Sequence, residues 1–163
     1  MYSLSKDTLV LALGNPLRGD DGLGARACEM LAEFPLPGGV SLLDGGTPGL
    51  ETVLLLQGYH RVVIIDAAEM GLKAGEWRRF MPDEATLGQA DLSRRGTLHA
   101  AGLAEALTLA EALGVLPAEI TIYGVQPAGI GWEPGLSAPV EAALPAVCAA
   151  IVRELGIDEP VNV

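Results

Sequence analysis

The sequence predicts an α/β fold in which a parallel or mostly parallel sheet is covered by helices on both faces. Short apolar runs alternate with helical patterns along the chain, as in proteins built from strand–helix–strand units. One of these runs, residues 61–66 (RVVIID), contains four consecutive β-branched residues, which is typical of a strand covered on both sides. At 163 residues, half of them hydrophobic, the chain suits a single domain spanning residues 1–163.

The individual elements follow from apolar periodicity and from the glycine and proline residues that interrupt it. We predict strands at residues 8–13, 40–43, 61–66, 76–80 and 120–125. We predict helices at residues 23–34, 50–57, 98–113 and 137–156, with Ser137 as the N-cap of the last. The direction of strand 76–80, parallel or antiparallel to its neighbours, stays open at this point.

Residues 9–24 (LVLALGNPLRGDDGLG) form the most informative stretch of the chain. An apolar strand stops at a Gly-Asn-Pro cluster, and Asp20 and Asp21 then precede the first helix. The glycine spacing matches that of a phosphate-binding loop, but two carboxylates stand where such a loop has lysine and serine or threonine, so we exclude a nucleotide cradle. Two interpretations stay open: the acids cap the helix, or they bind a cation at the mouth of the sheet.

Acidic residues follow three of the predicted strands: the Asp20–Asp21 pair, Asp44 and Asp66. Because the carboxyl ends of parallel strands lie at one edge of a sheet, these acids can converge. Of the two histidines, His99 lies in the first turn of a helix and can face the carboxylates, whereas His60 precedes a strand at the opposite edge and is expected on the surface.

Two carboxylates and one imidazole would form a mixed oxygen and nitrogen set with open coordination positions. Such a set suits a divalent ion such as zinc, nickel, manganese or iron, without selecting among them. The simpler alternative has Asp21 capping a helix, Asp66 bonding loop N–H groups and His99 exposed to solvent. The residues alone leave both interpretations open.

The composition excludes several classes of partner and mechanism. The formal net charge is −11 with only two lysines, which argues against nucleic acid or an anionic membrane as partner. The N-terminus lacks the order of a signal peptide and no apolar run reaches transmembrane length, so we expect a cytoplasmic protein. Cys28 and Cys148 form no metal or redox motif and are expected in helices, and no G-x-S-x-G nucleophile motif is present.

Taken together, these stretches resemble the hydrogenase maturation endopeptidase family, whose members remove a C-terminal extension from the large subunit of [NiFe]-hydrogenases after nickel insertion. The resemblance extends from Leu9 to about Leu155. The matching segments are GNPLRGDDGLG, LLDGGTPGLE, VVIIDAAEMGLKAGE, the TLH segment and YGVQP followed by GLSAPVEAAL. The resemblance implies a three-layer α/β/α sandwich on a twisted, mostly parallel five-stranded sheet.

The family's functional residues can be carried over position by position. The metal ligands fall on Asp21, Asp66 and His99, which would take part in catalysis through the metal. The substrate-binding turn falls on residues Asp44, Gly45, Gly46 and Thr47. Since adjacent residues at a helix start point in different directions, we expect Asp20 to bond backbone N–H groups while Asp21 binds the metal.

The resemblance implies a metal-dependent processing endopeptidase. Its partner would be a hydrogenase large-subunit precursor. Its cofactor would be a divalent metal, nickel on the family's pattern, either held by the protein or supplied by the precursor. The alternative is a non-catalytic, nickel-checking or chaperone-like binding protein of the same fold, which would share every ligand residue.

Overall fold

The computed structural model describes residues 6–82 and 98–156, and for residues 98–101 it describes the course of the helix only. Its five strands form one sheet in the order β2-β1-β3-β5-β4. All neighbouring strands are parallel except β4, which runs antiparallel to β5. The strands are β1 (Lys6–Ala12), β2 (Val40–Asp44), β3 (Tyr59–Ala67), β4 (Trp77–Phe80) and β5 (Glu119–Val125). The predicted mostly parallel sheet of five strands is therefore confirmed, and the direction of β4 is settled.

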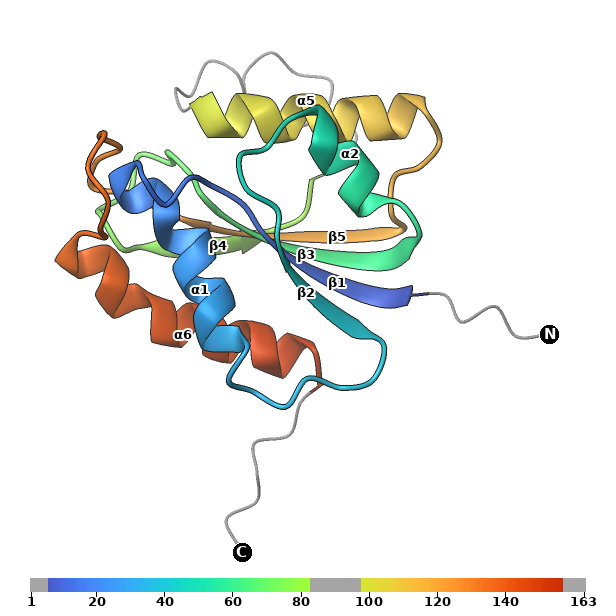
Figure 1. Ribbon diagram of the computed structural model, residues 1–163, viewed down its shortest axis with the longest axis horizontal. Helices are drawn as coiled ribbons and strands as arrows, with labels where there is room; N and C mark the ends of the chain where they lie inside the picture. Colours follow the sequence, from blue (N-terminus) through green and yellow to red (C-terminus); the bar gives the residue numbers. More distant parts are fainter. Residues whose placement is uncertain (1–5, 83–97, 157–163) are drawn as a thin grey trace, which may run out of the picture.

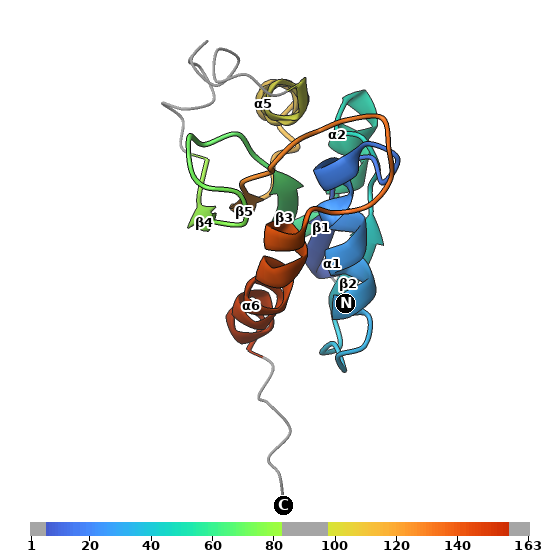
Figure 2. The same ribbon diagram turned by 90° about the vertical axis from the view of Figure 1, so that its left-hand side faces the viewer.

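Helices cover both faces of this sheet, so the predicted three layers are also confirmed. Helices α1 and α6 pack against each other on one face, and α2 and α5 pack against each other on the other (Figures 1 and 2). The described helices are the 3₁₀ helix η1 (Gly19–Gly22), α1 (Leu23–Leu31), α2 (Leu50–Leu56), α5 (Leu98–Ala112) and α6 (Ala138–Glu154). Of these, none is long and apolar enough to cross a membrane.

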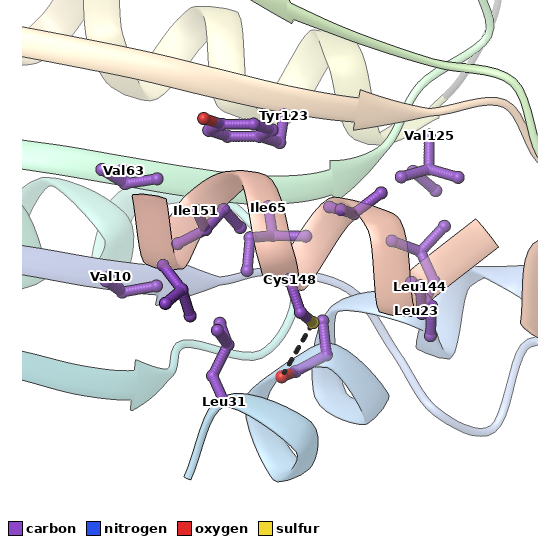
Figure 3. Packing of buried hydrophobic residues seen from close by; sticks show 14 of the residues in the cluster. Val10, Leu23, Leu31, Val63, Ile65, Tyr123, Val125, Leu144, Cys148 and Ile151 are labelled. Atoms are coloured by element: carbon purple, nitrogen blue, oxygen red, sulfur yellow. Dashed lines mark hydrogen bonds between the residues drawn. The ribbon is translucent and has the colours of Figure 1, made fainter. Parts of the chain in front are cut away.

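The alternation of side chains along the central strands divides the core into two halves. In β3, Val63 and Ile65 join the cluster beneath α1 and α6, whereas Val62 and Ile64 join the cluster beneath α2 and α5. Figure 3 shows the first of these clusters, in which side chains of α1 and α6 meet those of the strands. Burial on both faces explains why β3 reads as a continuous apolar run in the sequence.

The C-terminal ends of the parallel strands lie together at one edge of the sheet, on the left in Figure 1. At this edge Ala12 of β1 pairs with Asp44 of β2 on one side and with Ile65 of β3 on the other. Three loops meet there: residues 13–18, residues 45–49 and residues 126–137. This arrangement brings the acids that follow the strands into one region.

The predicted capping of α1 by the Asp20–Asp21 pair is wrong, whereas Ser137 is the N-cap residue of α6 as predicted, although its side chain does not make the cap. The Asp20–Asp21 pair lies inside η1, and the N-cap of α1 is Gly22, so neither acid caps that helix. Ser137 is the N-cap residue of α6, but its side chain makes no capping hydrogen bond. The Ser137 hydroxyl instead donates to Asp20 Oδ2, at 2.8 Å. Asp20 and Ser137 thus bond each other across the fold, where the local sequence predicts that each would bond the end of its own helix.

Candidate active site

A sharp turn after β1 places Asp21 over the end of the sheet. Gly14, with a φ of 125°, lets the chain turn back, and a Cβ atom there would lie only 2.1 Å from the Asp21 carbonyl oxygen. Any larger residue would push η1 away from the strand. The Asp21 side chain is buried, and its Oδ2 accepts a hydrogen bond of 2.7 Å from the Asn15 backbone N–H. The loop thus fixes the position of this carboxylate.

Asp66 lies near the end of β3 and is also buried, at 3% exposure. By strand alternation it follows Val62 and Ile64, so it lies on the sheet face that α2 and α5 cover. Its Oδ1 has no hydrogen-bond partner among the described residues. Burial raises the pKa of Asp66 well above its usual range, the nearby Asp21 charge raises the pKa further, and a hydrogen bond from the Ala67 N–H partly opposes both effects.

These two carboxylates have the character of a cation site. Two buried acids close enough to repel each other are stabilised by a positive ion, and the unbonded oxygen of Asp66 is the kind of ligand that divalent metals take. The residues present therefore fit a metal. The two acids are only part of a ligand set, because the described side chains contain no group of three or more His, Cys, Asp or Glu residues that could hold a metal ion. The third predicted ligand, His99, lies in the first turn of α5, but its side chain is outside the described residues.

The start of α5 lies close to the loop that follows β2. A Cβ atom on Gly102 would lie 2.8 Å from the carbonyl oxygen of Pro48, so glycine is required for this approach. The helix turn that contains His99 is adjacent to Gly102 and therefore lies at the same edge as Asp21 and Asp66. The other histidine, His60, is exposed at the opposite edge, as predicted.

Asp20 has a structural role, which agrees with the prediction for this residue. Its buried carboxylate accepts hydrogen bonds from the N–H groups of Ala128 (2.7 Å) and Ser137 (2.6 Å), from the Ser137 hydroxyl (2.8 Å) and, more weakly, from the Gly129 N–H (3.4 Å). These bonds fasten the loop 126–137 to η1. The two adjacent acids thus have different partners: Asp20 binds the loop 126–137, whereas Asp21 accepts from the Asn15 N–H and lies close enough to Asp66 for its charge to raise the pKa of that carboxyl.

The turn Asp44–Thr47 lies beside this pair of acids but presents a different surface. Asp44 is exposed, and its Oδ1 accepts a hydrogen bond of 3.1 Å from the Gly46 N–H. In β2 it follows Val40 and Leu42, which pack on the α1 and α6 side, so its carboxylate lies on the face opposite Asp66. Cys28 in α1 supports this placement: burial raises its pKa, and the charge of Asp44, which must therefore be near α1, raises it further. Asp44 therefore does not join the other two acids, and substrate binding by Gly45, Gly46 and Thr47 stays a prediction.

Two residues at the rim of this region were missed by the sequence reasoning. The Arg18 guanidinium lies over the ring of Trp132, 4.4 Å from its centroid, and Trp132 is 80% exposed. Arg18 directly precedes η1, and Trp132 lies in the glycine-rich loop 126–135. A tryptophan in such a loop was the one signal available, because a large aromatic side chain is unexpected in a segment that otherwise reads as a turn.

Comparisons with known proteins agree with this structure. Residues 25–154 match a family model described as hydrogenase maturation protease. The hydrogenase 2 maturation protease of Escherichia coli (strain K12) is 34% identical over 155 residues, which cover 92% of this chain and 93% of that protein. The hydrogenase expression/formation protein HupD of Rhizobium leguminosarum bv. viciae is 35% identical over 149 residues, covering 90% of this chain and 73% of that protein.

Solved structures give the same result. The hydrogenase maturating endopeptidase HybD from E. coli superimposes with a TM-score of 0.79 at 31% identity, over 92% of this chain and 94% of that one. The solution structure of an endopeptidase from Escherichia coli superimposes with a TM-score of 0.82 at 30% identity, over 93% and 95% of the two chains.

Proposed function

The chain belongs to the hydrogenase maturation protease family and is an endopeptidase of that family, and we propose that it is metal-dependent and removes the C-terminal extension of a [NiFe]-hydrogenase large-subunit precursor after nickel insertion. The observation that supports this proposal best is the pair of buried acids at the end of the sheet. Asp66 keeps an oxygen without a hydrogen-bond partner among the described residues, next to the fixed carboxylate of Asp21. Burying two like charges is costly unless a cation lies between them.

Asp21, Asp66 and His99 would hold the metal. A divalent ion held there would polarise the scissile carbonyl or lower the pKa of a bound water. The residues themselves supply position and exclusion of solvent: the Asn15 N–H holds Asp21 in place, and Asp66 is buried at the end of β3. Burial raises the pKa of Asp66, so cation binding, which needs the carboxylate form, competes with protonation of that carboxyl group.

The metal is the nickel already seated in the precursor. Two carboxylates and one imidazole leave coordination positions that ligands of the precursor can fill, and hard oxygen ligands hold nickel less firmly than thiolates would. Under this proposal the site tests whether the precursor carries nickel before the chain is cut. The cytoplasmic location expected from the sequence is part of the same proposal, because precursor and protein must meet in one compartment.

The adjacent acids provide a matched pair of variants that tests this assignment. Nickel-loaded precursor is incubated with wild-type protein, Asp21→Asn, Asp66→Asn or Asp20→Asn, and the precursor mass is followed. Loss of a metal ligand should slow cleavage by more than the roughly 10- to 100-fold that loss of an outer hydrogen-bond partner costs. Asp20→Asn should keep substantial activity, because Asp20 contacts the loop 126–137 and not Asp66. Equal loss in Asp20→Asn and Asp21→Asn, with both proteins folded, would refute the assignment.

A further inference from the structure

We propose that Leu17, Arg18 and Trp132 form a docking surface for the precursor at the rim of the active site, in which Arg18 binds an acidic group of the precursor and Leu17 and Trp132 cover apolar side chains. This inference rests on the proposed function and adds to it how the substrate is held. It is carried by three properties of these residues: their position, their exposure and the pairing of Arg18.

The position of the docking surface is fixed by the same bonds that build the site. Arg18 is three residues before Asp21 in the loop that follows β1. The loop carrying Trp132 is joined to it by hydrogen bonds from the Gly19 N–H to the Glu133 carbonyl (2.8 Å) and from the Asp20 N–H to the Gly129 carbonyl (3.3 Å). The Asp20 carboxylate adds its own bonds to that loop. Arg18 and Trp132 therefore lie on ordered chain that is bonded directly to η1, the helix that contains Asp21.

The apolar members of this surface are largely exposed to solvent. Trp132 is 80% exposed and Leu17 is 63% exposed. The other tryptophan, Trp77, is partly buried and lies against Tyr123, with ring centroids 6.0 Å apart. Holding a tryptophan ring in water sacrifices the burial that usually stabilises it, whereas tryptophan and arginine are the residues that most often dominate protein–protein contacts.

The electrostatic state of Arg18 identifies the chemistry of the partner. Its guanidinium lies over the Trp132 ring, and its Nε is buried without a hydrogen-bond partner in the described part of the chain. Arg26, Arg61 and Arg79 all pair with glutamates, but Arg18 forms no ion pair with a described residue. A guanidinium that is already stacked on a ring can still bind a carboxylate through its terminal N–H groups, and its stacking reduces the entropy lost on binding.

The partner is therefore a polypeptide segment that carries a carboxylate next to apolar residues. In a chain of net charge −11, a cation without an acidic partner in the described part of the chain favours such a segment over a basic one. The precursor reaches this rim because its cleavage point must lie at Asp21 and Asp66. Binding there would be uniform, equal before and during the reaction, and so would act on KM and not on kcat.

The test compares the processing kinetics of nickel-loaded precursor by wild-type protein, Arg18→Met, Arg18→Lys and Trp132→Ala. Matched controls are Arg153→Met, which removes an exposed arginine at the opposite end of α6, and Leu113→Ala, which removes an apolar side chain 60% exposed after α5. Arg18→Met and Trp132→Ala should each raise KM by about 10-fold or more, with kcat within about threefold. Arg18→Lys should fall between wild type and Arg18→Met, and the controls should be unchanged.

Salt dependence separates an ionic contact from a general loss of packing. The KM of wild-type protein should rise as the NaCl concentration is increased, and this dependence should be weaker in Arg18→Met because the screened ion pair is missing. Unchanged KM in both Arg18→Met and Trp132→Ala, with normal cleavage by wild type, would overturn the docking surface and leave the proposed function intact. An equal salt dependence in wild type and Arg18→Met would overturn the acidic partner group. Wild-type protein that leaves the precursor uncut would overturn the proposed function and, with it, this inference.

Discussion

Replacing Asp20 by alanine should destabilise the protein substantially, although this acid is not a proposed metal ligand. The side chain is only 2% exposed and accepts three short hydrogen bonds, from the Ala128 N–H at 2.7 Å, the Ser137 N–H at 2.6 Å and the Ser137 hydroxyl at 2.8 Å. Each bond to a charged group contributes about 1.5–3 kcal/mol, and each abandoned donor costs about 1–3 kcal/mol unless water replaces the acceptor.

Allowing for partial replacement by water, we expect Asp20→Ala to lower the free energy of unfolding by about 3–5 kcal/mol. For a chain of this length that loss corresponds to a fall in Tm of about 2–4 °C per kcal/mol. Urea denaturation gives the free energy and thermal denaturation the Tm. Ser137→Ala, which removes only the hydroxyl bond, should cost about 1 kcal/mol, and most of this cost should disappear in the Asp20→Ala background because the two groups share one bond.

A loss below about 1 kcal/mol in Asp20→Ala would refute this reasoning. It would mean that water satisfies the N–H groups of the loop 126–137 as well as the carboxylate does. Full additivity of the Asp20→Ala and Ser137→Ala effects would contradict the hydrogen bond between them. Either result would also weaken the claim that the loop carrying Trp132 is ordered by Asp20.

Three further predictions concern packing, pH and thiol reactivity. Gly102→Ala should lower the free energy of unfolding by about 1–3 kcal/mol despite the better helix propensity of alanine, because the new Cβ would meet the Pro48 carbonyl. Gly38 has open space around it, so Gly38→Ala should be near neutral in the same denaturation assay. In metal-free protein, Asp66→Asn should raise the free energy of unfolding at neutral pH. The pKa of Asp66 is higher in the native state than in the unfolded chain, so between the two pKa values the native state binds more protons and wild-type stability falls as the pH rises. Tm values measured over a pH series should therefore fall less in the variant than in the wild type. Burial raises the pKa of Cys148 to about 11, so a thiol reagent at pH 8 should leave Cys148 unmodified until the protein is unfolded, as followed by mass spectrometry. Rapid modification in the native state would contradict its buried position.

Local sequence signals were sufficient for the layers of this fold. The β-branched run of β3 and its terminal acid are covered on both faces because α1 and α6 pack on one side and α2 and α5 on the other. The short strand β4 could be located but not oriented, because four residues carry no information on which edge of the sheet they join. Its antiparallel pairing with β5 depends on how the whole chain packs.

The candidate site was less fully predictable, for physical reasons that differ between residues. Strand ends predicted that acids would share an edge, and Asp21 and Asp66 do lie close enough for one charge to raise the pKa of the other carboxyl. The same rule wrongly grouped Asp44 with these two acids. Asp44 also follows a strand at this edge, but strand alternation places its side chain on the opposite face of the sheet from Asp66. The capping role of the Asp pair was wrong, and Ser137 begins α6 as predicted but gives its hydroxyl to Asp20 and not to the helix end. The contact of Arg18 with Trp132 joins loops more than a hundred residues apart, which no local signal predicts.

Under the proposed function, the precursor is cut only when it carries nickel, through Asp21, Asp66 and His99. The most direct measurement is the intact mass of the large-subunit precursor after incubation with saturating protein, once with nickel loaded and once with all metal removed. We predict that the loaded precursor loses its C-terminal extension, that the metal-free precursor keeps its full mass, and that folded His99→Ala leaves both uncut. Efficient shortening of the metal-free precursor would contradict the nickel requirement, and an unchanged mass of the loaded precursor that nonetheless binds would show that the site recognises nickel without cutting.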